Sequence, residues 1–419
     1  MSYLFKHKVI DNFIIFFLIM STGGLLFVFN RNILSISFCI FLFAVVVSAY
    51  NIKRNIVLAS AMTFISVLFL GVINYFFAVQ EQVLNKYLFH LLTVLITIFV
   101  LFHFINNRSK NIFLERLYFI LKIIAFHSFL NFIFFFFIKN NLTTITATYH
   151  ECQTFQYLFF YTTDKSLIEV LGIEFCRNQG LFWEPGILQS FLNILFFLEA
   201  FVFKRSKKML ILIMFLILTT YSTTGIALLL LQLFFYSYNQ FKSSKLIPIL
   251  VLIFIIPIYF IFKANMYDKI KGDNEYSFQK RLFDLTQPIF IAIENPLTGI
   301  GLDLLQFQKL RKEFYISDNA LITVNNVFGT EVKVEISDKG SSNSIMFLLA
   351  ATGFPTTMIL LYMFLNQNLI THKKWLLMIV LIISVMSSPL LLRPFFFIFI
   401  CSGFINIFYK ITTHKYKLS

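Results

Sequence analysis

Residues 88–105 read LFHLLTVLITIFVLFHFI, an apolar run without Asp, Glu, Lys or Arg. A helix of this length crosses the hydrocarbon core of a bilayer, because it satisfies its own backbone hydrogen bonds. Similar runs recur along the chain, which has 419 residues, of which 58% are hydrophobic, 13% are charged and 58 are phenylalanine. A water-soluble domain of this size cannot cover so much apolar surface. The sequence therefore predicts an all-α protein, a polytopic transmembrane helical bundle.

About twelve spans are predicted within a single membrane domain over residues 1–419. The region 209–241 is too long for one simple span, and Ser222-Thr223-Thr224-Gly225 interrupts it, so we expect it to cross twice. The predicted spans lie near 11–30, 33–50, 56–79, 88–105, 112–138, 181–203, the two halves of 209–241, 246–262, 344–367, 375–391 and 394–410.

The distribution of Lys and Arg predicts the orientation of these spans. The net charge is +15, and cytoplasmic loops of membrane proteins are rich in Lys and Arg. With both termini in the cytoplasm, the short outer loops carry only Arg31, Lys86 and Arg393, while the basic clusters fall inside. Two larger loops, at about 139–180 and 263–343, are then expected on the outer side. The second is expected to contain short helices lying on the membrane.

The segment Arg177-Asn178-Gln179-Gly180-Leu181-Phe182-Trp183-Glu184-Pro185-Gly186 lies where the first outer loop meets an apolar run. Arg177 offers a rigid fork of donors that suits phosphate, and Glu184 offers an acceptor or a base. Pro185 suits the first turn of a helix, and a carboxylate before it faces the positive helix end. On local grounds alone, a capped helix start with an ion pair explains the segment equally well.

The second outer loop carries another cation, Arg281. Two arginines from separate loops can clamp a pyrophosphate, although solvated loop cations explain Arg177 and Arg281 equally well. Asn295-Pro296-Leu297-Thr298-Gly299-Ile300-Gly301 follows, and its glycines permit a tight turn or close approach of the backbone to a ligand.

Further polar residues lie between the apolar runs. Asn343, in Ser341-Ser342-Asn343-Ser344, either faces the same outer pocket or caps the next helix, and the cap is the simpler interpretation. Arg393-Pro394 forms a polar kink near the outer face. Cys152 and Cys176 share the first outer loop, where an oxidising compartment would permit a disulfide. The sequence has no nucleotide-binding or metal-binding motif, so any glycosyl donor would have to arrive preactivated on a carrier.

Together these segments resemble the bacterial O-antigen polymerase and O-antigen ligase superfamily of integral membrane glycosyltransferases. The resemblance rests on residues 177–186, 222–225 and 295–301, and on Ser342-Asn343 before a span with Gly353, in the family's order. It implies a C-type glycosyltransferase-like fold at the periplasmic face of the bacterial inner membrane. It also implies donor and acceptor glycans linked to undecaprenyl diphosphate, with no metal or cofactor.

The resemblance favours a polymerase, because family ligases typically carry a His-Asn pair where this chain has Ser342-Asn343. Arg177 and Arg281 would hold the diphosphate, and Glu184 would be the general base or would orient Arg177. The alternatives are a ligase that transfers glycan to lipid A–core, and a lipid-linked oligosaccharide flippase or other transporter. A chain-length regulator in the membrane is a further partner to consider; nucleic acid is not expected. The implied substrate-binding residues are Arg177, Gly180, Arg281, Gly299, Gly301, Ser342, Asn343 and Arg393.

Overall fold

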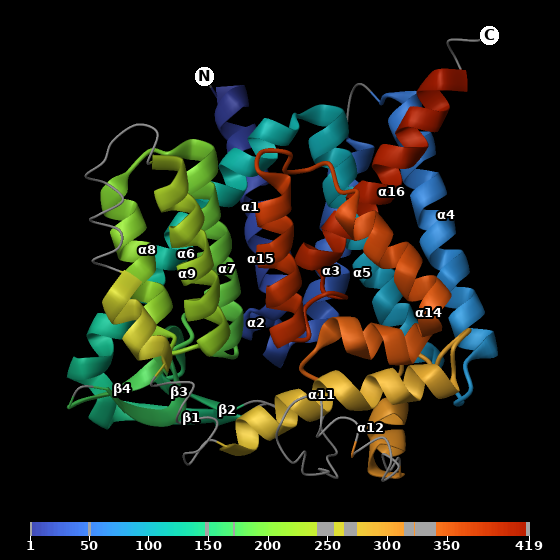
Figure 1. Cartoon of the computed structure of the whole chain (residues 1–419). Helices are drawn as coiled ribbons and strands as arrows, with labels where there is room; N and C mark the ends of the chain where they lie inside the picture. Colours follow the sequence, from blue (N-terminus) through green and yellow to red (C-terminus); the bar gives the residue numbers. More distant parts are fainter. Residues whose placement is uncertain are drawn as a thin grey trace. The chain divides into compact units, whose positions relative to one another are not determined.

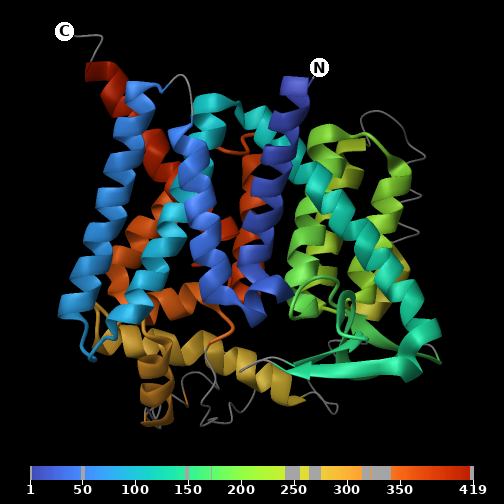
Figure 2. The same ribbon diagram turned by 180° about the vertical axis from the view of Figure 1, so that it is seen from behind.

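The computed structural model describes residues 2–48, 52–146, 151–170, 172–240, 255–263, 275–313, 322 and 341–415. The chain divides into two compact units, each built from segments that are far apart in the sequence (Figures 1 and 2). Unit 1 comprises Met1–Phe38, Arg108–Tyr267 and Ile370–Ser384. Unit 2 comprises Cys39–Asn107, Asp268–Leu369 and Val385–Ser419.

Six helices within the described residues are long and apolar enough to cross a membrane. They are α4 (Arg54–Phe77), α5 (Leu84–Phe102) with η1 (His103–Asn107), α6 (Lys110–Ile138), α7 (Pro185–Phe197) with η3 (Leu198–Phe203), α14 (Ser344–Leu365) and α16 (Pro394–Lys415). Shorter apolar helices are α3 (Arg31–Val47), α9 (Thr223–Gln240) and α15 (Lys374–Ser387). The protein is therefore a helical membrane protein, but the expected total of about twelve spans is not established. The span near 246–262 lies largely outside the described residues.

The region 209–241 forms two helices, as predicted. α8 (Lys207–Thr219) ends just before Tyr221, which has a φ of 47°, and α9 follows it. Gly225 lies in the first turn of α9, where an added Cβ would come within 2.9 Å of the Gln189 side chain. The glycine therefore permits close packing of α9 against α7, and the interruption itself lies slightly earlier than Ser222–Gly225.

α7 is the central helix of unit 1, and 83% of an 18-residue apolar stretch of α7 and η3 is buried inside the protein. α6, α8 and α9 pack against it, and α1 (Ser2–Gly23) packs against α6. The Phe182 and Phe191 rings stack with their centroids 5.0 Å apart. At the start of α6, Arg108 forms an ion pair with the buried Asp11, with Nε 3.3 Å from Oδ2.

The segment predicted as the first outer loop contains a β-sheet, so the all-α prediction was wrong at this point. The strands β1 (Leu142–Thr146), β2 (Glu151–Phe155), β3 (Leu158–Val170) and β4 (Ile173–Asn178) pair antiparallel in the order β1-β2-β3-β4. Their segments are rich in Thr, Ile, Phe and Tyr, residue types that favour strands. Figure 1 shows the sheet at one end of the helices of unit 1.

The sheet also bears on the predicted disulfide. Cys152 lies on β2 and Cys176 on β4, and both are buried. β3 lies between these two strands. A bridge between the two cysteines stays a prediction.

Unit 2 is built around α16, which packs against α4, α5 and α14. The segment predicted as the second outer loop contains α11 (Glu275–Glu294) and α12 (Leu304–Glu313), so helices are present there, and their position on the membrane stays a prediction. Figure 1 shows α11 lying across the ends of the long helices of this unit. It packs against α14, which is broken at Gly353 (φ 71°, ψ 177°). Parts of this loop, at 264–274, 314–321 and 323–340, lie outside the described residues.

Candidate functional site

In unit 1, the candidate residues lie at the β4–α7 corner, defined here as residues 177–186. The half-buried Arg177 ends β4 and donates from Nε to the Thr220 carbonyl oxygen at 3.1 Å. The buried Asn178 donates to the Ser128 carbonyl oxygen at 3.0 Å and to Thr219 Oγ1 at 3.2 Å. The corner is therefore fixed to both α6 and the end of α8, which gives the arginine a defined position.

Gly180 is needed for this packing. It has a φ of +56°, and an added Cβ would lie 2.5 Å from Ser128 Oγ. Its carbonyl oxygen accepts a hydrogen bond from Thr162 Oγ1 at 2.6 Å. A larger residue would strain the backbone and displace α6 or β3.

Glu184 is the N-cap residue of α7, with extended backbone, and Pro185 occupies the first turn. The helix start predicted from the sequence is thus confirmed. The Glu184 side chain makes no cap hydrogen bond to the helix backbone and is partly exposed. A carboxylate at a helix N-terminus faces the positive end of the helix, and it can orient a cation or accept a proton.

A group of buried amide side chains lies between α7 and α9. Asn193 donates to Gln189 Oε1 at 3.1 Å and accepts from Gln232 Nε2 at 2.9 Å. It also donates to the Gly225 carbonyl oxygen at 3.3 Å. Polar side chains between apolar helices hold those helices together, so this network fixes the start of α9 to α7.

In unit 2, three segments meet at the start of α14. The buried Asp284 of α11 accepts hydrogen bonds at Oδ2 from the Ser342 backbone nitrogen at 2.8 Å and from Ser342 Oγ at 2.6 Å. Ser344 donates from Oγ to the Ser388 carbonyl oxygen at 2.7 Å and accepts from the Leu390 backbone nitrogen at 2.8 Å. We call Asp284, Ser342–Ser344 and residues 388–393 the α14 N-terminal cluster.

Asn343 caps α14, which confirms the simpler of its two interpretations. Its Oδ1 accepts from the backbone nitrogens of Ile345 at 3.1 Å and Met346 at 3.2 Å. Because these donors and the Ser342 nitrogen are already engaged, the helix start has little remaining capacity for an anion. Anion binding at this cluster would have to rely on arginine side chains.

Two candidate arginines belong to the segments that form this cluster. Arg281 is exposed and lies one turn before Asp284 on α11, about 4.5 Å along the helix axis. Arg393 directly precedes α16 and is half-buried. Burial lowers the pKa of the Arg393 guanidinium to about 10, so it is still a cation at neutral pH. A cation that has lost part of its hydration interacts more strongly with an anion than a fully solvated one does.

Gly299 and Gly301 belong to a loop that packs closely against other backbone. A Cβ added to Gly299 would lie 2.5 Å from the Ala350 carbonyl oxygen, and one added to Gly301 would lie 2.0 Å from Gln82 Cδ. The Gly301 nitrogen donates to the Ala351 carbonyl oxygen at 2.8 Å. The described contacts of both glycines are therefore with the chain itself, and binding of substrate by them stays a prediction.

Asn74, Gln82 and Tyr87 hold this loop, and the sequence reasoning had not singled them out. Asn74 donates to the carbonyl oxygens of Thr298 at 2.7 Å and Ala351 at 2.8 Å. Tyr87 donates to Asn74 Oδ1 at 2.5 Å, and Gln82 donates to the Ile300 carbonyl oxygen at 2.9 Å. These bonds join the end of α4 to the loop that follows α11.

Residues 209–361 match a protein-family model described as O-antigen ligase. This match supports the resemblance of the chain to the O-antigen polymerase and ligase superfamily. No curated protein and no solved structure matches the chain.

The match extends from α8 through most of α14. It includes Arg281, the glycine loop and Ser342, while Arg177, Glu184 and Arg393 lie outside it. It also includes Asp284, whose contact with Ser342 the sequence reasoning missed. No local signal in the sequence points to this contact, because 58 positions separate Asp284 from Ser342.

Proposed function

We propose that this protein is an O-antigen polymerase. It joins oligosaccharide repeat units linked to undecaprenyl diphosphate at the periplasmic face of the bacterial inner membrane, with both termini in the cytoplasm. The observation that carries the proposal is the family match over the segment that contains Arg281 and Ser342. The enzyme class follows from the family, and the polymerase reaction is the finer inference.

The hydrogen bond from the Ser342 hydroxyl to Asp284 favours a polymerase over a ligase. The Ser342 hydroxyl donates to the buried Asp284, so this position holds a fixed, neutral group with lone pairs left to accept a hydrogen bond. Family ligases typically carry an imidazole base there. A ligase that uses lipid A–core as acceptor is the second candidate, and the family match supports it equally.

The proposed reaction exchanges one bond at the anomeric carbon of the donor glycan. The bond to the diphosphate oxygen breaks, and a bond to the acceptor hydroxyl oxygen forms. Arg177 and Arg281 each bind the diphosphate and stabilise the charge that develops on it as it leaves. Glu184 accepts the proton of the acceptor hydroxyl or orients Arg177. The prenyl diphosphate carries away the leaving charge, and no metal or nucleotide is required.

A flippase predicts charged residues along a path through many spans. The long described helices α5, α7 and α16 are instead largely apolar, and the candidate cations Arg177 and Arg393 lie next to the end of a strand and the start of a helix. Intramembrane charge is costly and is retained mainly where it functions. Its scarcity in these helices supports an enzyme that works at the membrane surface.

Arginine substitutions test the proposal in cells that depend on this protein to make long glycan chains. Arg177→Ala and Arg281→Ala should each abolish long chains while the protein still inserts, because each loses charge-assisted bonds worth about 3–4 kcal/mol in the transition state. Lys309→Ala is the matched control, because Lys309 is an exposed cation on α12 outside both groups of candidates. Wild-type glycan ladders from both arginine variants would refute the assignment.

A further inference from the structure

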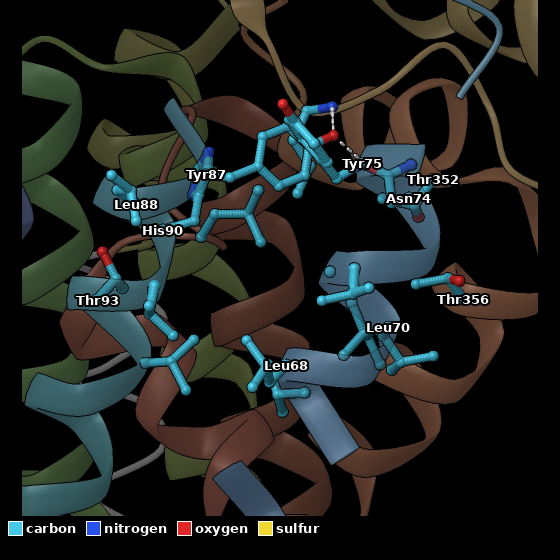
Figure 3. Close-up of a pocket in the computed structure, with 18 of the residues that line it drawn as sticks. Leu68, Leu70, Asn74, Tyr75, Tyr87, Leu88, His90, Thr93, Thr352 and Thr356 are labelled. Carbon is cyan, nitrogen blue, oxygen red and sulfur yellow. Dashed lines mark hydrogen bonds between the residues drawn. The ribbon is translucent and has the colours of Figure 1, made fainter. Parts of the chain in front are cut away.

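A lipid-facing groove in unit 2 has no role in the proposed reaction. It has a volume of about 270 Å³ and lies between α4, α5 and α14, with one wall completed by Leu302. It extends from Val67 to Phe76 on α4, which is about 14 Å along the helix. Figure 3 shows Asn74, Tyr75 and Tyr87 together at one end and Leu68 toward the other.

The groove opens onto hydrocarbon. Leu68, Val72 and Leu88 line it and are 38%, 42% and 49% exposed, and they belong to helices that are candidate spans. Only 22% of an 18-residue apolar stretch of α4 is buried inside the protein. Water would find few polar partners inside, and an empty groove would lose dispersion contacts along its walls. A hydrocarbon chain from the bilayer is the occupant that satisfies both conditions.

The polar end of the groove indicates which kind of lipid supplies the hydrocarbon chain. Asn74, Tyr75 and Tyr87 form a neutral, hydrogen-bonding rim, and tyrosines of this kind favour the membrane interface. Lys86 is exposed at the start of α5, four residues before the lining residue His90 and thus on the same helix face. The apolar chamber matches the acyl chain of a phospholipid, the neutral side chains of Asn74, Tyr75 and Tyr87 match its ester groups, and the nearby Lys86 matches its phosphate.

A prenyl diphosphate fits this profile less well. The lining residues of this groove, all of which are described, include none of Asp, Glu, Lys or Arg. A diphosphate carries more negative charge than one lysine offsets, and bidentate recognition of phosphate favours arginine. We propose that the groove binds one acyl chain of a bilayer phospholipid, with the ester groups at the rim and the phosphate near Lys86. The inference does not depend on which glycan reaction the protein catalyses.

Gly71 provides a substitution that fills the groove without a clash. It lines the groove, and a Cβ added there has nothing within 4 Å. Phenylalanine also has a higher helix propensity than glycine, so Gly71→Phe should fold. Ile65→Phe is the matched control, because Ile65 is 61% exposed on the same helix but does not line the groove.

The test uses the purified full chain in nanodiscs that contain phosphatidylglycerol with a photoreactive diazirine on one acyl chain. Mass spectrometry then locates the labelled peptides. Wild type and Ile65→Phe should be labelled mainly on α4 and α5. The same peptides of Gly71→Phe should be labelled at least about tenfold less than those of wild type. The reason is that each methylene excluded from an apolar site lowers binding about fourfold.

Two further arms identify the lipid. A diacylglycerol probe with the same diazirine should label wild type less than the phosphatidylglycerol probe, and Lys86→Gln should remove that difference. Unlabelled phosphatidylglycerol should compete with the probe, whereas polyprenyl diphosphate should not. Equal labelling of Gly71→Phe and wild type, competition by polyprenyl diphosphate alone, or even labelling of all lipid-facing helices would each overturn the proposal. The competition arms use wild type and therefore hold even if a variant misfolds.

Discussion

Replacing Asp284 tests whether the α14 N-terminal cluster is held together as the structure shows. The carboxylate is buried, and its Oδ2 accepts from both the backbone nitrogen and the hydroxyl of Ser342. Asp284→Ala leaves those two donors without this acceptor, whereas Asp284→Asn keeps an acceptor and loses the charge. The two variants therefore separate the loss of the contact from the loss of the charge.

The magnitude follows from the two bonds. A hydrogen bond to a charged group contributes about 1.5–3 kcal/mol, so Asp284→Ala should destabilise the protein by about 3–5 kcal/mol. Asp284→Asn should cost about half of that, because neutral hydrogen bonds are roughly half as strong. Ser342→Ala removes only the hydroxyl donor and should cost about 1–2 kcal/mol. In the double variant the effects should fall short of additivity by about 1–2 kcal/mol, as expected for residues in contact.

The assay is an unfolding titration of the purified variants in mixed micelles, combined as a double-mutant cycle. Glu294→Ala is the control, because Glu294 is exposed on the same helix and should change stability by less than about 0.5 kcal/mol. Strict additivity of Asp284→Ala and Ser342→Ala would refute the contact. A loss for Glu294→Ala equal to that for Asp284→Ala would show that α11 responds to any substitution.

Two further predictions concern a proton acceptor and a glycine. Glu184→Gln should lower the rate of chain elongation by about 10²–10⁴-fold if Glu184 is the base, with insertion unchanged; near-normal chains would make it an orienting group instead. Gly299→Ala should destabilise the protein by about 2–4 kcal/mol in the same titration, because the added Cβ would overlap the Ala350 carbonyl oxygen at a φ of +66°. Gly71→Ala, with nothing within 4 Å of its added Cβ, should not destabilise it, and equal losses for the two glycine variants would contradict the close contact.

Long apolar runs were sufficient to predict that the protein is built from membrane helices. The starts of α7 at Pro185 and of α14 after Asn343 followed from local rules, because proline and a cap residue act through their nearest neighbours. The division of 209–241 was predicted from the length of this run and from Ser222–Gly225, which interrupt it. The count of spans was less secure, because helix length and hydrophobicity alone do not say which helices cross.

The sheet was missed because its strands lie in a loop whose hydrophobic pattern is irregular. β3 combines Leu158-Phe159-Phe160-Tyr161 with Thr162-Thr163-Asp164-Lys165, which gives no sustained alternation. Its pairing with β2 and β4 also includes register shifts, which depend on partners rather than on local sequence.

The candidate sites divide in the same way. Arg177 and Arg281 could be selected as cations near apolar runs, since charge in such places needs a reason. The contact of Asp284 with Ser342 spans a separation of 58 residues, and no local rule predicts it. The same holds for Asn74, which reaches Thr298 across a separation of 224 residues.

The most direct test of the polymerase assignment is elongation by the purified chain. The protein is mixed with repeat units linked to undecaprenyl diphosphate, without nucleotide sugar and with a metal chelator present. We predict a ladder of products that differ by one repeat unit, and its loss in Arg177→Ala and Arg281→Ala. Failure to elongate, together with transfer of glycan to added lipid A–core, would contradict the polymerase assignment and identify a ligase.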